Sequence, residues 1–235
     1  MKGTVSALWL TAIMAMASSL DISAQETVEL SLEGSVVNQY IWRGQYIGEA
    51  YLQPTLSVAW QGLSLTAEAS TPLTNPQNAQ ELDLTASYTW RGLSFGIVDY
   101  WSTNTGGRYF YYPEHGSGHI FEAFAAYDFG PLSVSWQTYF AGNDFNDEGK
   151  RTYSSYAELK APFRLADCQW QATMGIVPTA STNYETTSFA VTNIELKVSK
   201  DIQITDKFSL PIFASFIANP CSQKAYLVFG FTLTP

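Results

Sequence analysis

The segment that decides the fold is residues 51–61, Tyr51-Leu-Gln-Pro-Thr-Leu-Ser-Val-Ala-Trp-Gln61. Its apolar and polar side chains alternate, so an extended chain would present an apolar face and a polar face. The same alternation returns almost without error in residues 63–70 and 81–90. We therefore predict β-strands for all three segments.

The composition agrees with β-structure and excludes several protein classes. The chain has 235 residues, of which 46% are hydrophobic, 15% aromatic and only 14% charged, with a formal net charge of −9. These values argue against a disordered chain, a collagenous repeat and a nucleic-acid-binding protein. Because the mean hydropathy is −0.05 despite the high apolar content, apolar and polar residues must be interleaved.

The N-terminus has the features of an export signal. Lys2 precedes an apolar run over 5–17, and Ile22-Ser23-Ala24 offers small residues for cleavage. The run is shorter than the roughly 20 residues that a transmembrane helix needs. We expect a signal peptide over 1–24 and a single domain over 25–235.

No second long apolar segment follows, so a mature chain that entered a membrane would need a closed barrel. Continued alternation predicts an all-β fold, a transmembrane antiparallel up-and-down β-barrel of about 12 strands. The expected strands are 27–42, 51–61, 63–70, 81–90, 93–101, 119–129, 132–141, 152–161, 168–177, 188–198, 208–218 and 225–234.

The connections between these strands alternate between short and long. Short turns are expected at 61–62, 91–92, 130–131, 162–167 and 199–207, and longer loops at 43–50, 71–80, 102–118, 142–151, 178–187 and 219–224. An even strand count puts both termini on the short-turn, periplasmic side. Pro54 and Pro211 fall inside strands, where we expect bulges because proline cannot donate to the ladder.

Aromatic residues cluster near the predicted strand ends. This placement is typical of the rings that lie at the headgroup level of a membrane. The expected girdle comprises Tyr40, Trp42, Trp60, Tyr88, Trp90, Trp101, Tyr127, Phe129, Trp136, Phe140 and Trp170. A soluble secreted β-sandwich, in which aromatics would face a second sheet, is the alternative.

Several motifs resemble the TorF-type porin family of Gram-negative outer membranes. They are Tyr40-Ile-Trp-Arg-Gly44, Leu52-Gln-Pro-Thr-Leu-Ser57, Glu81-Leu-Asp-Leu84 and Phe95-Gly-Ile-Val-Asp-Tyr100. The resemblance implies an outer-membrane barrel and a channel, with no catalytic residue. Residues 225–233 also resemble the closing strand of such barrels, which implies contact with the barrel assembly machinery, although the chain ends in Thr234-Pro235 rather than an aromatic.

If the apolar parity meets lipid, the other parity lines the lumen. The acidic residues on that parity outnumber the basic ones, and acidic side chains in a pore favour cations. The predicted lumen charges are Glu29, Glu33, Arg43, Glu68, Glu81, Asp83, Glu122, Asp128, Glu158, Lys160, Glu195 and Lys197. We expect a narrow channel for small polar or cationic solutes; the alternative is a non-conducting structural or ligand-binding barrel whose lumen is plugged by these groups.

The 102–118 segment is the longest and least regular loop. Arg108, Tyr109, Tyr111 and Tyr112 are candidate ligand contacts for a sugar or another flat molecule, or could fold into the mouth as a constriction. The alternative is a loop packed on its own aromatics or on the barrel rim.

Two further sets of residues suggest chemistry only weakly. Glu114, His115 and His119 lack the spacing of a metal site, so we expect no metal and no cofactor. His115 and Ser117 could belong to an outer-membrane lipid hydrolase, but they form no recognisable catalytic motif, and we expect no enzyme.

The acidic segment Asp144-Phe-Asn-Asp-Glu-Gly149 partly matches a calcium loop, but Ser155 stands where a bidentate glutamate is needed. We expect a solvated acidic turn. Cys168 and Cys221 fall at opposite ends of the predicted barrel, too far apart for a disulfide, so both should be free thiols. The expected partners are outer-membrane lipids and small solutes, with no nucleic acid.

Overall fold

The computed structural model describes residues 28–105, 108–113, 115–206 and 208–235. The predicted signal peptide, 1–24, lies outside the described residues. Within them, no helix has the length and hydropathy needed to cross a bilayer.

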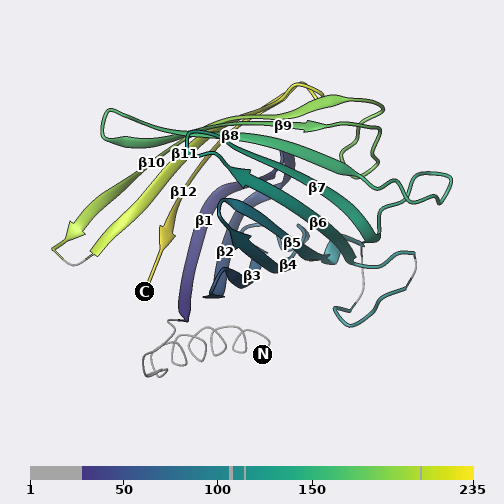
Figure 1. The fold of residues 1–235 in the computed structure, drawn as a ribbon, viewed down its shortest axis with the longest axis horizontal. Helices are drawn as coiled ribbons and strands as arrows, with labels where there is room; N and C mark the ends of the chain where they lie inside the picture. Colours follow the sequence, from purple (N-terminus) through teal and green to yellow (C-terminus); the bar gives the residue numbers. More distant parts are fainter. Residues whose placement is uncertain (1–27, 106–107, 114, 207) are drawn as a thin grey trace.

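Twelve antiparallel strands form one closed barrel, in which each strand pairs with its neighbours along the chain and β1 pairs with β12 (Figure 1). The predicted all-β barrel of 12 strands is confirmed, and a two-sheet sandwich is wrong. The strands are β1 (Glu29–Trp42), β2 (Gln45–Trp60), β3 (Leu63–Pro72), β4 (Glu81–Trp90), β5 (Leu93–Ser102), β6 (His119–Asp128), β7 (Ser133–Gly142), β8 (Ser155–Leu165), β9 (Cys168–Val177), β10 (Ala190–Thr205), β11 (Phe208–Asn219) and β12 (Lys224–Leu233), with a short 3₁₀ helix η1 (Thr103–Thr105) after β5.

The alternation of side chains separates an apolar outer face from a largely polar interior. Leu65, Trp90 and Phe229 are each 55% exposed on the outside. Glu122 and Ser215, on the other parity of their strands, are buried. Closing the sheet on itself gives every strand a partner on both sides, which is why this arrangement needs no second layer.

The two ends of the barrel differ in their connections. The turn end carries 61–62, 91–92, 129–132, 166–167 and 206–207, and the loop end carries 43–44, 73–80, 103–118, 143–154, 178–189 and 220–223. The start of β1 and the end of β12 both lie at the turn end, because Gly34 pairs with Leu233.

Three predicted connections were too long. β2 begins at Gln45, so the expected 43–50 loop is instead the two-residue turn Arg43-Gly44, with φ of 50° and 81°. The 162–167 segment contains only the turn Ala166-Asp167, and β10 continues through most of 199–207. Two successive residues with positive φ give the type I′ hairpin turn, whose twist matches that of the strands.

Neither proline requires the predicted bulge. Pro54 pairs in register with Gly34, and on its other side the ladder to β3 is interrupted between Leu52 and Thr55 without a shift. Pro211 pairs in register with Asp201 and lies just beyond Ile212, where the ladder to β12 ends. Each proline therefore lies where pairing with one neighbouring strand is absent, so its missing N–H donor breaks no ladder hydrogen bond on that side.

The β1–β2 hairpin leaves the barrel wall half-way along its length. β1 pairs with β12 only from Gly34 to Val37, and the β1–β2 register shifts after Tyr40. Beyond Val37 the side chain of Asn38 takes over the pairing: its Nδ2 donates to Leu227 O (3.1 Å), and its Oδ1 accepts from Phe229 N (2.8 Å). These bonds satisfy two backbone groups of β12 that have lost their partner strand.

The tip of the hairpin therefore crosses the loop end of the barrel, and its purple ribbon bends under the green strands (Figure 1). Asn219 Nδ2, at the end of β11, donates to Gly44 O (3.1 Å). A Cβ added to Gly44 would lie 1.9 Å from Thr192 O at the start of β10. Only glycine fits this approach.

The seam of the barrel should depend on Asn38. We expect Asn38→Ala to lower the free energy of unfolding by about 1–2 kcal/mol, because two hydrogen bonds to β12 are lost. Urea unfolding of the refolded barrel measures this change, with the exposed Asn104→Ala as the control. Equal stability of the two variants would contradict the role assigned to Asn38.

Candidate functional site

An ion pair spans the lumen at the loop end of the barrel. Arg43, on the hairpin tip, forms a bidentate pair with Glu122 of β6, with Nη1–Oε2 at 2.6 Å and Nη2–Oε1 at 2.9 Å. The side chains are 12% and 2% exposed. Since β6 lies five strands from β1 in the ring of 12, the pair ties together nearly opposite walls.

Aromatic rings surround this ion pair. Tyr184, in the 178–189 loop, is buried; it accepts a hydrogen bond from Arg43 Nη1 and stacks on Trp42 with ring centroids 5.8 Å apart. It also stacks on Tyr139 and Tyr156 at 6.0 and 5.8 Å. We call Trp42, Arg43 and Tyr184, with their wall partners Glu122, Tyr139 and Tyr156, the plug.

The electrostatics of the plug are balanced internally. The Arg43 guanidinium lies 4.4 Å from the ring centroid of Trp42 and 4.7 Å from that of Tyr156, in cation–π geometry. Burial raises the pKa of the Tyr184 phenol above its ordinary value. The phenol therefore stays neutral beside the ion pair, and Glu122 alone neutralises Arg43.

The 178–189 loop is held in place by Asp144. This side chain is fully buried and accepts hydrogen bonds from Thr152 Oγ1 (2.6 Å), Ser154 N (3.0 Å) and Asn183 Nδ2 (2.8 Å). The predicted solvated turn is thus wrong for Asp144, because the neighbouring loop covers it. Asp147 and Glu148 of the same segment are exposed.

The calcium pattern in this segment has a different local role. Asn146 Oδ1 accepts from the backbone amides of Glu148 and Lys150, so it stabilises its own turn. Among the residues the structure describes, no group of three or more His, Cys, Asp or Glu is placed to hold a metal ion.

Below the plug, one wall of the lumen is acidic. Glu68 of β3 and Asp83 of β4 are direct cross-strand partners, and Glu81 pairs with Ser70 next to them. Glu33 of β1 lies on the same inner parity. Within the described part of the chain, none of these carboxylates has a basic group within 4.0 Å. We call these four residues the acidic wall.

Four other predicted lumen charges have interaction partners outside the plug and the acidic wall. Lys160 pairs with Glu158 at 2.7 Å, Lys197 lies over the ring of Phe213, and Glu195 accepts from Ser215 Oγ at 2.7 Å.

Two predicted lumen charges lie at the turn end of the barrel. Glu29 is exposed at the start of β1. Asp128 accepts from Gly130 N and so caps the turn that follows β6. The 12 predicted residues therefore divide into the plug, the acidic wall, locally satisfied pairs and the barrel rim.

Two residues of the predicted aromatic girdle lie inside the barrel instead. Tyr40 is buried against Tyr51, and Trp42 belongs to the plug, because the hairpin bend turns this part of β1 inward. Trp60, Trp90 and Trp136 are exposed on the outer face as predicted.

Sequence reasoning missed Tyr139, Tyr156 and Tyr184 as lumen residues. A signal existed for two of them: Tyr139 shares its parity with Gln137, and Tyr156 shares its parity with Glu158. Tyr184 lies in a loop, where period-2 alternation carries no information.

In the described part of the 102–118 loop, two of the predicted ligand residues lie against the outer wall of the barrel. Tyr109 and Tyr112 pack on the ring of His119, with centroids 5.0 and 4.3 Å away. His119 shares its parity with the outward-facing Phe121, and its Nδ1 lies 2.7 Å from Asp99 Oδ1. Tyr109 and Tyr112 thus pack on the barrel wall and do not form a constriction, whereas a ligand role for the exposed Arg108 and Tyr111 stays a prediction.

The remaining predicted residues are separated. His115 packs on Phe145, whereas Ser117 Oγ accepts from His119 N (3.0 Å). Glu114 lies outside the described residues. Cys168 and Cys221 are both free, as predicted.

Comparison with known proteins finds no family model that matches this chain and no curated protein that is significantly similar to it. The resemblance to TorF-type porins therefore stays a prediction.

The plug should be sensitive to the loss of one charge. We expect Glu122→Leu to destabilise the barrel by about 3–5 kcal/mol, because Arg43 would keep a buried charge without a partner. The double variant Arg43→Met/Glu122→Leu should recover most of this loss in urea unfolding. Lys150→Met, which breaks an exposed pair with Glu148, is the control and should cost about 0–1 kcal/mol. Additive effects of the two plug substitutions would contradict the coupling.

Proposed function

We propose that this protein is an outer-membrane β-barrel that admits small polar or cationic solutes through a narrow, acidic lumen. The proposal assigns it no catalytic step. It has two parts, the location of the barrel in the outer membrane and the preference of its lumen for cations.

The outer face supports the location. Large apolar side chains such as Leu65, Phe95, Ile97, Phe216 and Leu227 are about half exposed or more around the barrel. Water-soluble monomers rarely expose contiguous apolar patches of more than a few hundred Å². Lipid acyl chains are the partner that fits such a face. The outward Phe229 and Leu233 of β12 are the segment that we expect the assembly machinery to bind.

The acidic wall is the observation that carries the preference of the lumen. Three of its members, Glu68, Glu81 and Asp83, lie side by side on β3 and β4. The three predicted lumen bases are paired with other groups or stacked on rings. A low-dielectric barrel concentrates the field of such unbalanced charges and attracts counter-ions. Cations should therefore enter more readily than anions.

Bilayer recordings test this preference. In a gradient of KCl, we expect small conductance steps and a reversal potential of the sign that indicates cation selectivity. Glu68→Gln/Asp83→Asn should shift the reversal potential toward zero, because it removes the charge pair at the centre of the wall.

The double variant Asp147→Asn/Glu148→Gln is the matched control, since it removes the same charge from an exposed loop and should leave selectivity unchanged. Anion selectivity of the wild type, or identical effects of the two double variants, would contradict the proposal.

The plug favours a second candidate function, a structural barrel that does not conduct. Under the channel proposal, Trp42→Ala/Tyr184→Ala should enlarge a conductance that the wild type already shows. A wild type that stays silent at all voltages, with a variant that conducts, would favour the structural barrel.

A further inference from the structure

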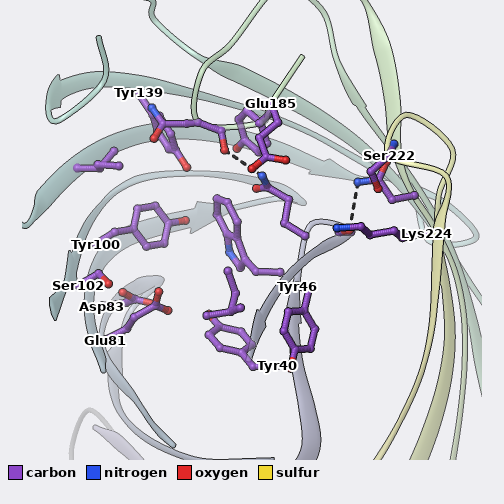
Figure 2. A pocket seen from close by; sticks show the side chains of 18 of the residues that line it. Tyr40, Tyr46, Glu81, Asp83, Tyr100, Ser102, Tyr139, Glu185, Ser222 and Lys224 are labelled. Carbon is purple, nitrogen blue, oxygen red and sulfur yellow. Dashed lines mark hydrogen bonds between the residues drawn. The ribbon is translucent and has the colours of Figure 1, made fainter. Parts of the chain in front are cut away.

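A cavity of about 530 Å³ lies beside the plug at the loop end of the barrel. Its wall is rich in aromatic rings, including Tyr40, Trp42, Tyr46, Tyr100 and Tyr226. Figure 2 shows Tyr100 with Glu81 and Asp83 on one side, and Ser222 and Lys224 on the opposite side. The volume falls in the range of about 300–1,000 Å³ that is typical of small-molecule sites.

The ionisable side chains that line the cavity are predominantly acidic. Glu81, Asp83 and Glu185 line it, against Lys224. Lys224 and Glu185 are both exposed, whereas Glu81 and Asp83 are half-buried. The nearby Arg43 does not offset these carboxylates, because Glu122 already neutralises it. The inner carboxylates are therefore available to pair with a positively charged ligand.

The aromatic rings of the cavity indicate which class of cation it would bind. A small inorganic ion would leave a cavity of this size largely empty and would gain little from ring faces compared with its own hydration shell. An organic ammonium group is weakly hydrated and binds aromatic faces through cation–π attraction. The plug contains an internal example, since the Arg43 guanidinium already lies over Trp42 and Tyr156.

We propose that this cavity binds a small organic cation, an alkylated or quaternary ammonium compound. Glu81 and Asp83 attract its charge, while the rings of Tyr46 and Tyr226, stacked with centroids 6.0 Å apart, contact its apolar substituents. The inference deepens the proposed function by naming the class of solute that the barrel takes up, and it rests on that function for access to the solute.

Binding of choline to the refolded full-length barrel in detergent tests the proposal. We expect choline to bind and to change the tryptophan fluorescence, because Trp42 lines the cavity. The uncharged isostere 3,3-dimethylbutan-1-ol should bind at least about tenfold more weakly, because it lacks the charge that the carboxylates and rings attract.

Two variants locate the site. Glu81→Gln/Asp83→Asn should weaken choline binding by about tenfold or more, through the loss of both carboxylates. Tyr46→Leu, at a partly exposed ring, should weaken it by about threefold through the loss of a ring face. Asp147→Asn/Glu148→Gln removes equal charge outside the cavity and should bind like the wild type. Heat-modifiable migration on gels confirms that each variant is folded.

The proposal is overturned by undetectable choline binding, by equal binding of choline and its isostere, or by preferential binding of a neutral sugar such as glucose. Indifference of choline binding to both cavity variants would also overturn it. Because binding is measured without a bilayer, its outcome is separate from that of the conductance experiment. A barrel that conducts cations but does not bind choline contradicts this inference alone. A barrel that binds choline but does not conduct contradicts the proposed passage of solutes through the lumen.

Discussion

The bend of the β1–β2 hairpin at Asn38 is the constraint on which the rest of the structure depends. If β1 continued in the wall beyond Val37, Arg43 would stand at the rim and could not reach Glu122 on the far side. The bend brings a strong cation into the lumen, and the plug forms around that cation. The cavity, in turn, is the space left between the bent hairpin, the acidic wall and the end of β12.

The interior of this barrel combines two ways of handling polar groups away from bulk water. At the loop end, Arg43, Glu122 and Tyr184 form hydrogen bonds with one another. Removing one of them would leave buried polar groups of the others without a partner. Along β3 and β4, carboxyl groups face each other without a base, and either a bound cation or protonation of one carboxyl relieves their repulsion. The first arrangement fixes the position of the hairpin, and the second supplies the negative charge on which the proposed cation preference rests.

The sequence predicted the barrel because period-2 alternation is strongest where a strand separates an apolar outside from a polar inside, as in 81–90. It failed at 43–50, where a register shift between β1 and β2 breaks the alternation, so that the first residues of β2 looked like a loop. The same bend explains why Tyr40 and Trp42, which look like girdle residues, lie inside. The acidic residues were found on the correct parity, but parity says nothing of distance across a lumen, so the partnership of Arg43 with Glu122 was not predictable.

The inward position of the hairpin can be measured directly by cross-linking. Gln45 Nε2 on the hairpin donates to Asn183 O on the 178–189 loop at 2.9 Å. In a Cys168→Ser/Cys221→Ser background, the pair Gln45→Cys/Asn183→Cys should join rapidly with a short bifunctional thiol reagent. Ser35→Cys/Thr232→Cys, across the β1–β12 seam, is the positive control. Cross-linking of the seam pair without cross-linking of the hairpin pair would show that the hairpin stands outside the lumen and would contradict this account.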